Sequence, residues 1–377
     1  MIRWLAALVM AGAAHAAEPP PKPNGAFRIA QFNAALSRRN PGELVQELRL
    51  GGSEQIDAVA EIIQRVQPDI ILLNEVDFDA RGVAADLLRR TLAEGRGGAD
   101  GIDYPHLYLR PSNTGALTEH DLNSDGKVSR PHDAYGFGWF EGQYGMAILS
   151  RFLIDETASR SFQLARWADM PKALLPKDYY GAAAGDLRLS SKSHWDVAVT
   201  LPDRRTLRLL ASHPTPPVFD GPEDRNGRRN HDEIRFWIDY IGGADWIVDD
   251  AGSRGGLQSG ADWVVLGDLN ADPADGDGRL GAIRDLYAMG QDPAPASRGG
   301  AEAANKTHRG DPALDTADWR EDGGPGNLRV DHIIPSTAFD VLDAGVFWPA
   351  KDDPLRRLVG EGSEVSSDHR LIWVDLK

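Results

Sequence analysis

The sequence of 377 residues contains no cysteine. Disulfide bonds and structural thiolate metal sites are therefore excluded, and stability must come from the core and from any bound cations. Basic residues are also scarce, because 41 lysines and arginines face 57 aspartates and glutamates, which gives a net charge of −16. Most nonspecific nucleic-acid binders carry a basic patch, and no basic stripe is visible here. This charge argues against a processive nuclease, but small phosphorylated substrates and nucleic acids bridged by metal ions stay open.

Long apolar runs are absent outside the N-terminus. Arg3 precedes an apolar run at 4–14, and Ala14-His15-Ala16 matches a small-x-small cleavage site. We interpret residues 1–16 as a secretory signal peptide cleaved near Ala16 and Ala17, followed by a proline-rich spacer at 17–26. Because the run is shorter than the roughly 20 residues that span a bilayer, we expect no stable membrane anchor. The protein is expected to be secreted or periplasmic.

The remaining residues, 27–377, are predicted to form one domain in which short apolar strands alternate with amphipathic helices. This order is typical of a layered α/β or α+β sandwich. The spacing of apolar residues predicts helices at 54–66, 83–92, 232–248 and 280–289, and strands at 27–32, 70–73, 146–149, 195–201, 207–212, 263–266, 328–334 and 371–376. Two stretches rich in glycine and aspartate, 96–144 and 272–323, are interpreted as inserted surface loops.

An apolar strand at 264–266 runs into Gly-Asp-x-Asn, which contains Asp268 and Asn270. Residues two apart in a strand point to the same side, so both side chains can converge just past its end. A carboxylate and a carboxamide there can hold a metal-bound phosphate and its attacking water. The alternative is an ordinary turn, because glycine, aspartate and asparagine are common turn formers.

Asp368 and His369 stand before the last apolar strand, and Asp331 lies inside another. An aspartate beside a histidine can supply a metal ligand and a general base. Since an unpaired carboxylate in an apolar strand is costly, Asp331 needs a partner, and His369 is the natural candidate.

Three further apolar strands also end in polar residues. Glu75 follows the strand at 70–73 and is the type of oxygen ligand that Mg²⁺ prefers. Asn33 ends the first strand in the same way, and His213 follows the strand at 207–212, where it could donate to a phosphate oxygen. Strand ends that gather at one rim place a polar site on a rigid scaffold.

In this order the motifs resemble the endonuclease/exonuclease/phosphatase superfamily, which includes deoxyribonuclease I. The resemblance extends from Arg28-Ile29-Ala30-Gln31-Phe32-Asn33 to Ser367-Asp368-His369 and includes the glycine-rich strand that leads to Leu149-Ser150-Arg151. It implies a four-layer α/β/β/α sandwich, in which two packed mixed sheets are flanked by helices. It also implies hydrolysis of phosphate esters with Mg²⁺ or Mn²⁺.

The resemblance assigns a role to each matching residue. It makes Glu75 the principal metal ligand, with Asn33 beside it and Asp368 as a further ligand. His369 and its partner Asp331 would be catalytic together with Asp268, Asn270 and His213, and either His369 or Asp268 would act as the base on water. The number of catalytic metals stays open. Alternatives are a secreted deoxyribonuclease-type endonuclease and a non-catalytic module that binds cations or ligands.

Two polar segments, 188–196 and 213–230, depart from the family's general motifs. They carry cations that could bind a phosphorylated group: Lys192, His194, Arg225, Arg228 and Arg229. The alternative is a solvated, salt-bridged loop. Because subfamilies should differ in such segments, the substrate stays open between a small molecule and a nucleic acid. We also expect the protein to be a monomer.

Asp121, Asn123 and Asp125 precede Gly126 in the pattern of the first half of a calcium loop. His132 stands at the twelfth position, where a bidentate glutamate is expected, and Asp133 follows one place late. The segment is either a structural Ca²⁺ site that braces the inserted loop or a polar turn.

Overall fold

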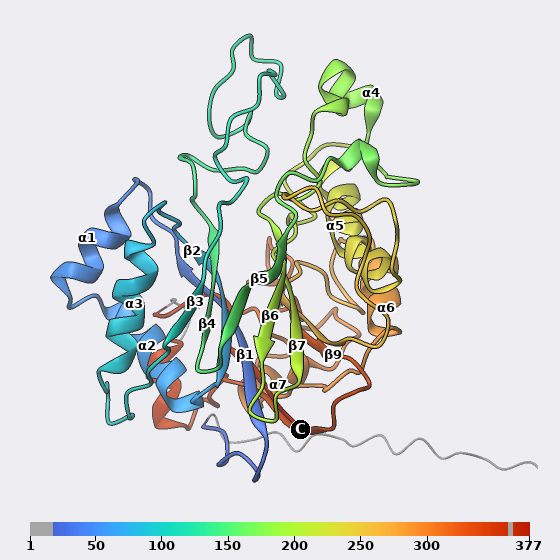
Figure 1. Ribbon diagram of the computed structural model, residues 1–377. Helices are drawn as coiled ribbons and strands as arrows, with labels where there is room; N and C mark the ends of the chain where they lie inside the picture. The colour runs from blue at the N-terminus through green and yellow to red at the C-terminus, as the bar shows by residue number, and fades with distance from the viewer. Residues whose placement is uncertain (1–17, 361–364) are drawn as a thin grey trace, which may run out of the picture.

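A computed structural model describes residues 18–360 and 365–377, so the expected signal peptide at 1–16 lies outside the described residues. Two β-sheets lie face to face, and helices cover the outer side of each (Figure 1). This four-layer α/β sandwich of two mixed sheets confirms the fold class predicted from the sequence. None of the helices in the described ranges is long and apolar enough to cross a membrane.

The first sheet has the strand order β10-β11-β1-β2-β4-β3. Its strands are β1 (Phe27–Leu36), β2 (Ile70–Val76), β3 (His106–Tyr108), β4 (Gly145–Ser150), β10 (Val341–Val346) and β11 (Ile372–Leu376). β1 runs parallel to β2, so the two strands end at the same edge, while β1 pairs antiparallel with β11 from Phe27 opposite Leu376 onward. The outer face carries α1 (Glu43–Leu50), α2 (Glu54–Val66) and α3 (Val83–Ala93).

The second sheet has the order β5-β6-β7-β8-β9. Its strands are β5 (Ile154–Ser161), β6 (His194–Thr200), β7 (Thr206–Ser212), β8 (Asp262–Asp268) and β9 (Asp331–Pro335). β7 and β8 are parallel, so His213 and Asp268 lie at one edge. The helices that follow the sheet are α4 (Lys177–Tyr180), α5 (Arg225–Ile241), α6 (Gly281–Tyr287) and α7 (Arg298–Glu302), with 3₁₀ turns at Trp167–Asp169, Gly181–Gly185, Pro312–Leu314 and Pro354–Leu358.

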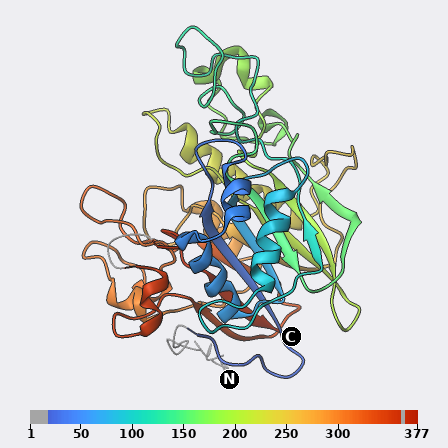
Figure 2. The same cartoon turned by 90° about the vertical axis from the view of Figure 1, so that its left-hand side faces the viewer.

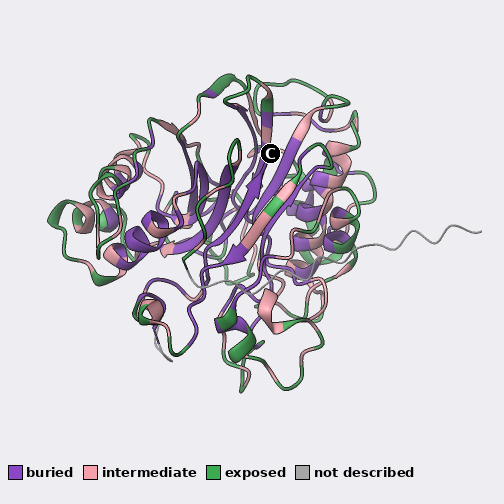
Figure 3. Ribbon diagram, turned by 90° about the horizontal axis from the view of Figure 1, so that it is seen from below, coloured by how far each residue is buried: buried purple, intermediate pink, exposed green. Residues whose placement is uncertain are grey.

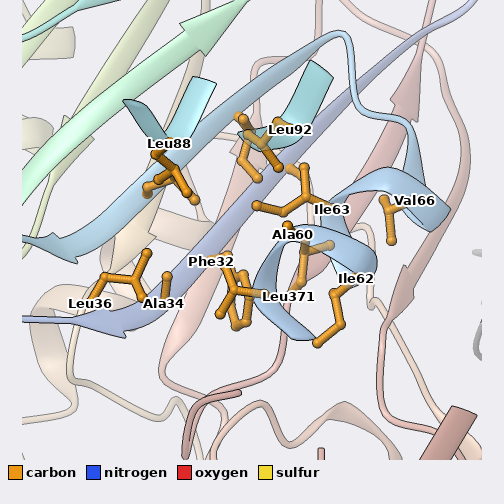
Figure 4. Packing of buried hydrophobic residues seen from close by; sticks show 14 of the residues in the cluster. Phe32, Ala34, Leu36, Ala60, Ile62, Ile63, Val66, Leu88, Leu92 and Leu371 are labelled. Atoms are coloured by element: carbon orange, nitrogen blue, oxygen red, sulfur yellow. The ribbon is translucent and has the colours of Figure 1, made fainter. Parts of the chain in front are cut away.

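Alternation along the strands produces three apolar layers. In β2, Ile70 and Leu72 face the second sheet, while Ile71 and Leu73 face the helices α2 and α3. The outer layer of the first sheet packs Phe32 of β1 against α2 and α3 (Figure 4). Most strands are buried on both faces and are rich in apolar residues, while the exposed residues lie mainly on loops and outer helices (Figure 3).

The helix α2 begins and ends at the residues that the sequence predicts. Its N-cap Ser53 accepts a hydrogen bond from the Ile56 amide, and Gln67 adopts a left-handed conformation before Pro68. The helix predicted at 232–248 was wrong at both ends, because α5 already begins at Arg225 and stops at Gly242, where glycines end it.

The helix predicted at 280–289 is confirmed by α6. The predicted surface loops contain further regular structure, since β3 lies within 96–144 and α7 lies within 272–323. The segment 109–144 and α4 both extend from the end of the molecule to which the strand β1 leads (Figures 1 and 2). They therefore flank the edge at which the candidate residues gather.

Candidate active site

His369 and Asp331 form a buried hydrogen-bonded pair at the centre of the site. His369 Nδ1 lies 2.8 Å from Asp331 Oδ2. Gln31 Nε2 donates to the other carboxylate oxygen over 2.9 Å, and Thr316 Oγ1 donates to Oδ2 over 2.8 Å. Since a carboxylate only accepts, Nδ1 carries the proton. This bond turns His369 Nε2 toward Asp268, whose Oδ2 lies 3.7 Å away.

Asp268, the last residue of β8, is the point at which the two sheets meet. Its Oδ2 accepts a 3.0 Å hydrogen bond from Asn33 Nδ2 of β1 and lies 3.3 Å from His213 Nε2 at the end of β7. Its Oδ1 accepts the Asn270 backbone amide over 3.0 Å. Asn270 has a left-handed φ of 51° and donates its side-chain amide to the Pro214 carbonyl, so the Gly-Asp-x-Asn motif is a tight turn as well as part of the site.

The charges of this group are set by burial and by mutual contact. Burial favours the neutral form of Asp268, but the nearby His369 and His213 outweigh it, and the pKa of Asp268 is lowered. For His369 burial also favours the neutral form, yet Asp331 and Asp268 raise its pKa well above the usual value. Burial and Lys192 lower the pKa of His213. The site therefore pairs an anionic Asp268 with a cationic His369 and a neutral His213.

Glu75 and Asp368 form the acidic side of the site. Glu75 is the penultimate residue of β2, has a left-handed φ of 59° and makes no ion pair with any described residue. Burial raises its pKa, and the Asp368 charge raises it further, while His369 opposes the rise. Asp368 accepts a 2.8 Å hydrogen bond from Trp319 Nε1. Two neighbouring carboxylates fit a divalent cation, and the Asn33 amide lies beside Glu75.

A second group of possible ligand atoms consists of Asp268, Asp331 and His369, which lie within 4.8 Å of one another. Their acceptors and donors are already used within the protein, because Asp331 accepts from three side chains and Asp268 accepts from Asn33, His213 and a backbone amide. The acids of Glu75 and Asp368 have fewer partners, so that side of the site fits a metal ion better.

Lys192 lies in the site, close to Glu75 and Asp268, two residues before the start of β6. Its side chain is 93% buried, with 7% exposed, and its ammonium has no hydrogen bond or ion pair with a described residue. Burial lowers its pKa, while the charges of Glu233, Glu75 and Asp268 oppose that shift. An unpaired buried ammonium among acids is costly unless an anionic ligand also contacts it.

The structure places the other predicted substrate cations elsewhere. His194 is buried between Phe236 and Trp237 and bonds the Glu233 carbonyl, and burial lowers its pKa to about 4. It therefore has no atom free for a substrate. The sequence pattern marked it as polar, but its position at the start of β6 turns it inward.

The three arginines of α5 mainly hold loops. Arg229 donates to three backbone carbonyls, those of Leu189, Tyr135 and Arg188. Arg225 pairs with Glu223, and Arg228 makes only a 3.5 Å contact with the Leu174 carbonyl. The structure thus brings Lys192 alone of the five predicted cations to the catalytic group.

The acids of the predicted calcium loop bond to the backbone of their own segment. Asp133 is buried, and its two oxygens accept the amides of Leu122 and Ser129 over 2.7 Å each. Asp121 accepts two amides, at Asp125 and Gly126, while Asn123 accepts the Asp125 amide as well. Within 18–360 and 365–377, these acids do not come together as a group of three ligands. This geometry is compatible with a polar turn, and the calcium site stays a prediction.

Several residues of the site were missed by the sequence analysis. Gln31 and Asn74 lie in apolar strands, where a polar residue is itself a signal, and Asn74 Oδ1 accepts both Gln31 Nε2 and the Asp268 amide. Thr316 and Trp319 lie in the loop 303–330 without any pattern that marks them. Asn230 and Glu233, one turn apart on α5, bind the backbones of the loops that carry Lys192, His213 and Asn270.

Comparison with known proteins agrees with this arrangement. The model of the Endonuclease/Exonuclease/phosphatase family matches residues 30–369. The chain belongs to this family. The members of the Endonuclease/Exonuclease/phosphatase family are hydrolases of phosphoester bonds, so in coarse terms this chain is a phosphoester hydrolase. The family generally uses a divalent metal.

Two solved structures share the fold of this family member. The endonuclease/exonuclease/phosphatase from Beutenbergia cavernae DSM 12333 has a TM-score of 0.51 at 17% identity, with 93% of this chain and 71% of that chain covered. The family protein from Leptotrichia buccalis C-1013-b has a TM-score of 0.50 at 18% identity, with coverage of 93% and 99%. Comparison with curated proteins returned no match.

Proposed function

We propose that this protein is a Mg²⁺- or Mn²⁺-dependent hydrolase that cleaves phosphodiesters or phosphomonoesters by in-line attack of water. One observation carries the proposal: an anionic Asp268 faces the His369–Asp331 pair, with an unpaired Lys192 on one side and the carboxylates of Glu75 and Asp368 on the other. These are the charges that an anionic substrate and an attacking water require.

The residues of the chain divide the work by charge. Glu75, Asp368 and Asn33 would hold the cation, which when bound neutralises the phosphate and stabilises the charge of the transition state. Asp268 accepts the proton of the attacking water, because it is the anionic acceptor at the centre of the group. Lys192 and the protonated His369 bind phosphate oxygens. His213 and the Asn270 amide keep Asp268 in position.

The test is an assay of purified protein with Mg²⁺, Mn²⁺ or Ca²⁺ on plasmid DNA, bis-p-nitrophenyl phosphate and p-nitrophenyl phosphate. We expect turnover of at least one small ester that EDTA abolishes and that Mg²⁺ or Mn²⁺ restores. Nicked plasmid would instead favour a deoxyribonuclease-type endonuclease. No turnover of these esters, or of sphingomyelin and inositol phosphates, would contradict the proposal and favour a module that only binds cations or ligands.

We also propose that the protein is exported and acts as a monomer. The apolar run and the Ala-x-Ala pattern before residue 17 support export. N-terminal sequencing of protein recovered from the periplasm or the medium should find Ala17 first. Light scattering of the purified protein should give the mass of one chain.

A further inference from the structure

Exposed aromatic side chains gather around the active site. Among the large apolar side chains of the described residues that remain exposed, the aromatic ones are Phe137, Trp139, Tyr179 and Phe219. Phe137 and Trp139 belong to the inserted segment 109–144, Tyr179 to α4, and Phe219 to the segment that follows His213. Exposed aromatics that gather in one region commonly mark a binding surface.

The segment with Phe137 and Trp139 crosses from one sheet to the other beside the site. At one end Gly136 donates its amide to the Asn113 carbonyl over 3.0 Å, and the Asn113 amide donates to the Lys192 carbonyl over 2.9 Å. A Cβ on Gly136 would collide with the backbone of Ser191, so only glycine allows this close approach.

The other end of the same segment is held beside the metal side of the site. Gly142 accepts the Phe78 amide over 2.8 Å, and Phe78 lies three residues after Glu75. The Tyr144 amide donates over 3.2 Å to Ser37 Oγ, which in turn bonds the Glu75 carbonyl. The segment 136–142 is therefore fixed between the backbone of Lys192 and the end of β2, and Phe137 and Trp139 lie at the rim between them.

The two rings form a rigid but solvent-facing pair. Their centroids lie 6.3 Å apart at an interplanar angle of 81°, which is an edge-to-face contact. Phe137 is 51% exposed and Trp139 is 59% exposed, so each ring keeps a free face. The Trp139 backbone is held by a 2.8 Å hydrogen bond to Gln143 Oε1. A pre-ordered aromatic face stacks on a ligand ring at little cost in entropy.

A second group of exposed aromatic side chains lies on α4 and on the segment after His213. The Arg225 guanidinium lies 5.3 Å above the Tyr179 ring, and Arg225 Nη2 donates to the Phe219 carbonyl over 3.1 Å. Phe219 is 87% exposed in a left-handed conformation with φ 65°. The strand end with His213 leads into the segment that carries Phe219, so this group is joined to the site through the chain.

We propose that Phe137 and Trp139 form a stacking platform for a ring in the alcohol part of the substrate. This inference rests on the proposed function and names its substrate class: a small phosphoester of a ring-bearing alcohol, either a nucleoside or a sugar. Bases and sugars both stack on aromatic faces. The net charge of −16 disfavours a long polyanion, which would also have to pass the acidic surface.

The test compares three phosphomonoesters of equal phosphate charge: a nucleoside monophosphate, a hexose phosphate and glycerol phosphate, which has no ring. If the enzyme cleaves only diesters, the p-nitrophenyl phosphodiesters of the same alcohols replace them. Trp139→Ala should raise KM for the ring-bearing substrate about tenfold with little change in kcat, and Phe137→Ala should act in the same direction. KM for the glycerol ester should not change.

Leu153→Ala is the matched control, since Leu153 is 55% exposed and follows β4 at the end of that strand away from Glu75. It should leave all three KM values unchanged. Whether the nucleoside or the hexose ester shows the effect identifies the ring. Equal KM values for all esters in the wild type, or an unaltered preference in Trp139→Ala, would overturn the proposal while hydrolysis itself stands.

A binding measurement separates this inference from the proposed function. Calorimetric titration of the His369→Ala variant with the nucleoside and hexose phosphates needs no turnover. We expect one of them to bind, and Trp139→Ala in the same background to weaken its binding about tenfold. Binding that depends on Trp139, without hydrolysis by the wild type, would contradict only the proposed catalytic function. Equal binding by His369→Ala and by the variant that also carries Trp139→Ala would contradict the proposed stacking platform.

Discussion

The single hydrogen bond between His369 and Asp331 decides how the histidine faces the site. Asp331 is buried, which raises its pKa, and the hydrogen bonds that it accepts from His369 and Thr316 oppose this rise. Gln31 donates to its other oxygen. The hydrogen bond from His369 Nδ1 to Asp331 fixes the tautomer and the orientation of His369, and leaves its Nε2 atom facing the site.

Asp331→Asn is expected to remove most of the activity and to leave the chain folded. The single carbonyl oxygen of an asparagine can take the place of Oδ2 and accept from Thr316 and His369, while its NH₂ group then faces the Gln31 amide. The asparagine also lacks the charge that stabilises a protonated His369. We expect kcat to fall by about 10²–10³, the range for loss of one donor that stabilises the charge of the transition state. Steady-state kinetics beside circular dichroism checks this outcome.

His369→Ala should abolish activity to the same extent, again without loss of the fold. The double variant Asp331→Asn/His369→Ala tests whether the two residues act as a pair. If its kcat differs strongly from that of Asp331→Asn alone, they do not.

His194 makes stability depend on pH. Its folded pKa is lowered from 6.5 to about 4, so below pH 6.5 the unfolded chain binds a proton that the folded chain refuses. Its contribution is therefore fully present above pH 6.5 and is lost as the pH falls toward 4, by about 3 kcal/mol in total. Urea unfolding at several pH values in this window should show this slope.

His194→Gln should reduce that slope by about one proton, because glutamine does not titrate and can still donate to the Glu233 carbonyl. The slope should not vanish, since burial also lowers the pKa of His332, to about 3. An unchanged slope in the variant would mean that His194 is not the buried neutral group described here.

At the scale of elements, side chains in the first turns of α5 hold the loops of the site together through hydrogen bonds. Glu233 accepts the amides of Ser191 over 2.7 Å and Thr215 over 2.6 Å. Asn230, one turn earlier, donates to the carbonyls of Thr215 and Leu269 over 2.9 Å each and reaches that of Asn270 over 3.3 Å. One helix face therefore sets the distances between the loops that carry Lys192, His213 and Asn270.

Glu233→Gln should weaken substrate binding without unfolding the chain. One amide keeps its acceptor, while the other meets an NH₂ group, so the loops of Lys192 and His213 shift apart. We expect KM to rise about tenfold, from a loss of about 1–2 kcal/mol in one buried hydrogen bond. Asp239→Asn, on the same helix but paired with Arg235, is the control and should keep the wild-type KM. A loss of thermal stability without any change in KM would reduce Glu233 to a purely structural residue.

The helices α2 and α5 and the strands show how far the sequence predicts the structure. Apolar spacing located α2 and eight of the eleven strands that the structure describes in the two sheets, all except β3, β5 and β10, because those elements bury apolar faces. It missed the start of α5, whose first turns contain arginines and Asn230 that bind loop carbonyls instead of packing in a core. It also missed β5, an edge strand with an exposed polar centre.

The candidate site was predictable where polar residues end apolar strands, as with Glu75 and Asp268. It was not predictable where the contact depends on tertiary structure alone. Thr316 and Trp319 lie far from any motif, and Arg229 looks like a substrate cation until its carbonyl partners are known. Charge alone in a sequence does not tell which cations are already paired.

For the whole molecule, an ion bound by Glu75 and Asp368 should raise stability. The carboxylates come from the ends of β2 and the loop before β11, so their ligation ties distant parts of the first sheet together. At a Mg²⁺ concentration 100 times its Kd, the gain is about 3 kcal/mol. Thermal unfolding with and without EDTA measures it.

Glu75→Gln should lose that shift, while Asp125→Asn in the polar turn should keep it. If Ca²⁺ instead gives a shift that Asp125→Asn removes, the turn at 121–133 binds calcium. If neither Mg²⁺ nor Mn²⁺ shifts the thermal unfolding of the wild type, the assignment of Glu75 as a metal ligand is contradicted.

The pairing of β1 with β11 has a consequence for how the protein is made. The strand that begins the domain lies between β2 and β11, and β11 is the last strand of the chain. A nascent chain has β1 long before its neighbour β11, and His369 is made more than 300 residues after β1 begins. The first sheet and the active site therefore stay incomplete until residues 369–376 have left the ribosome. Because so many contacts join segments that are far apart in the sequence, we expect folding to be slow and the enzyme to stay inactive until these residues have emerged.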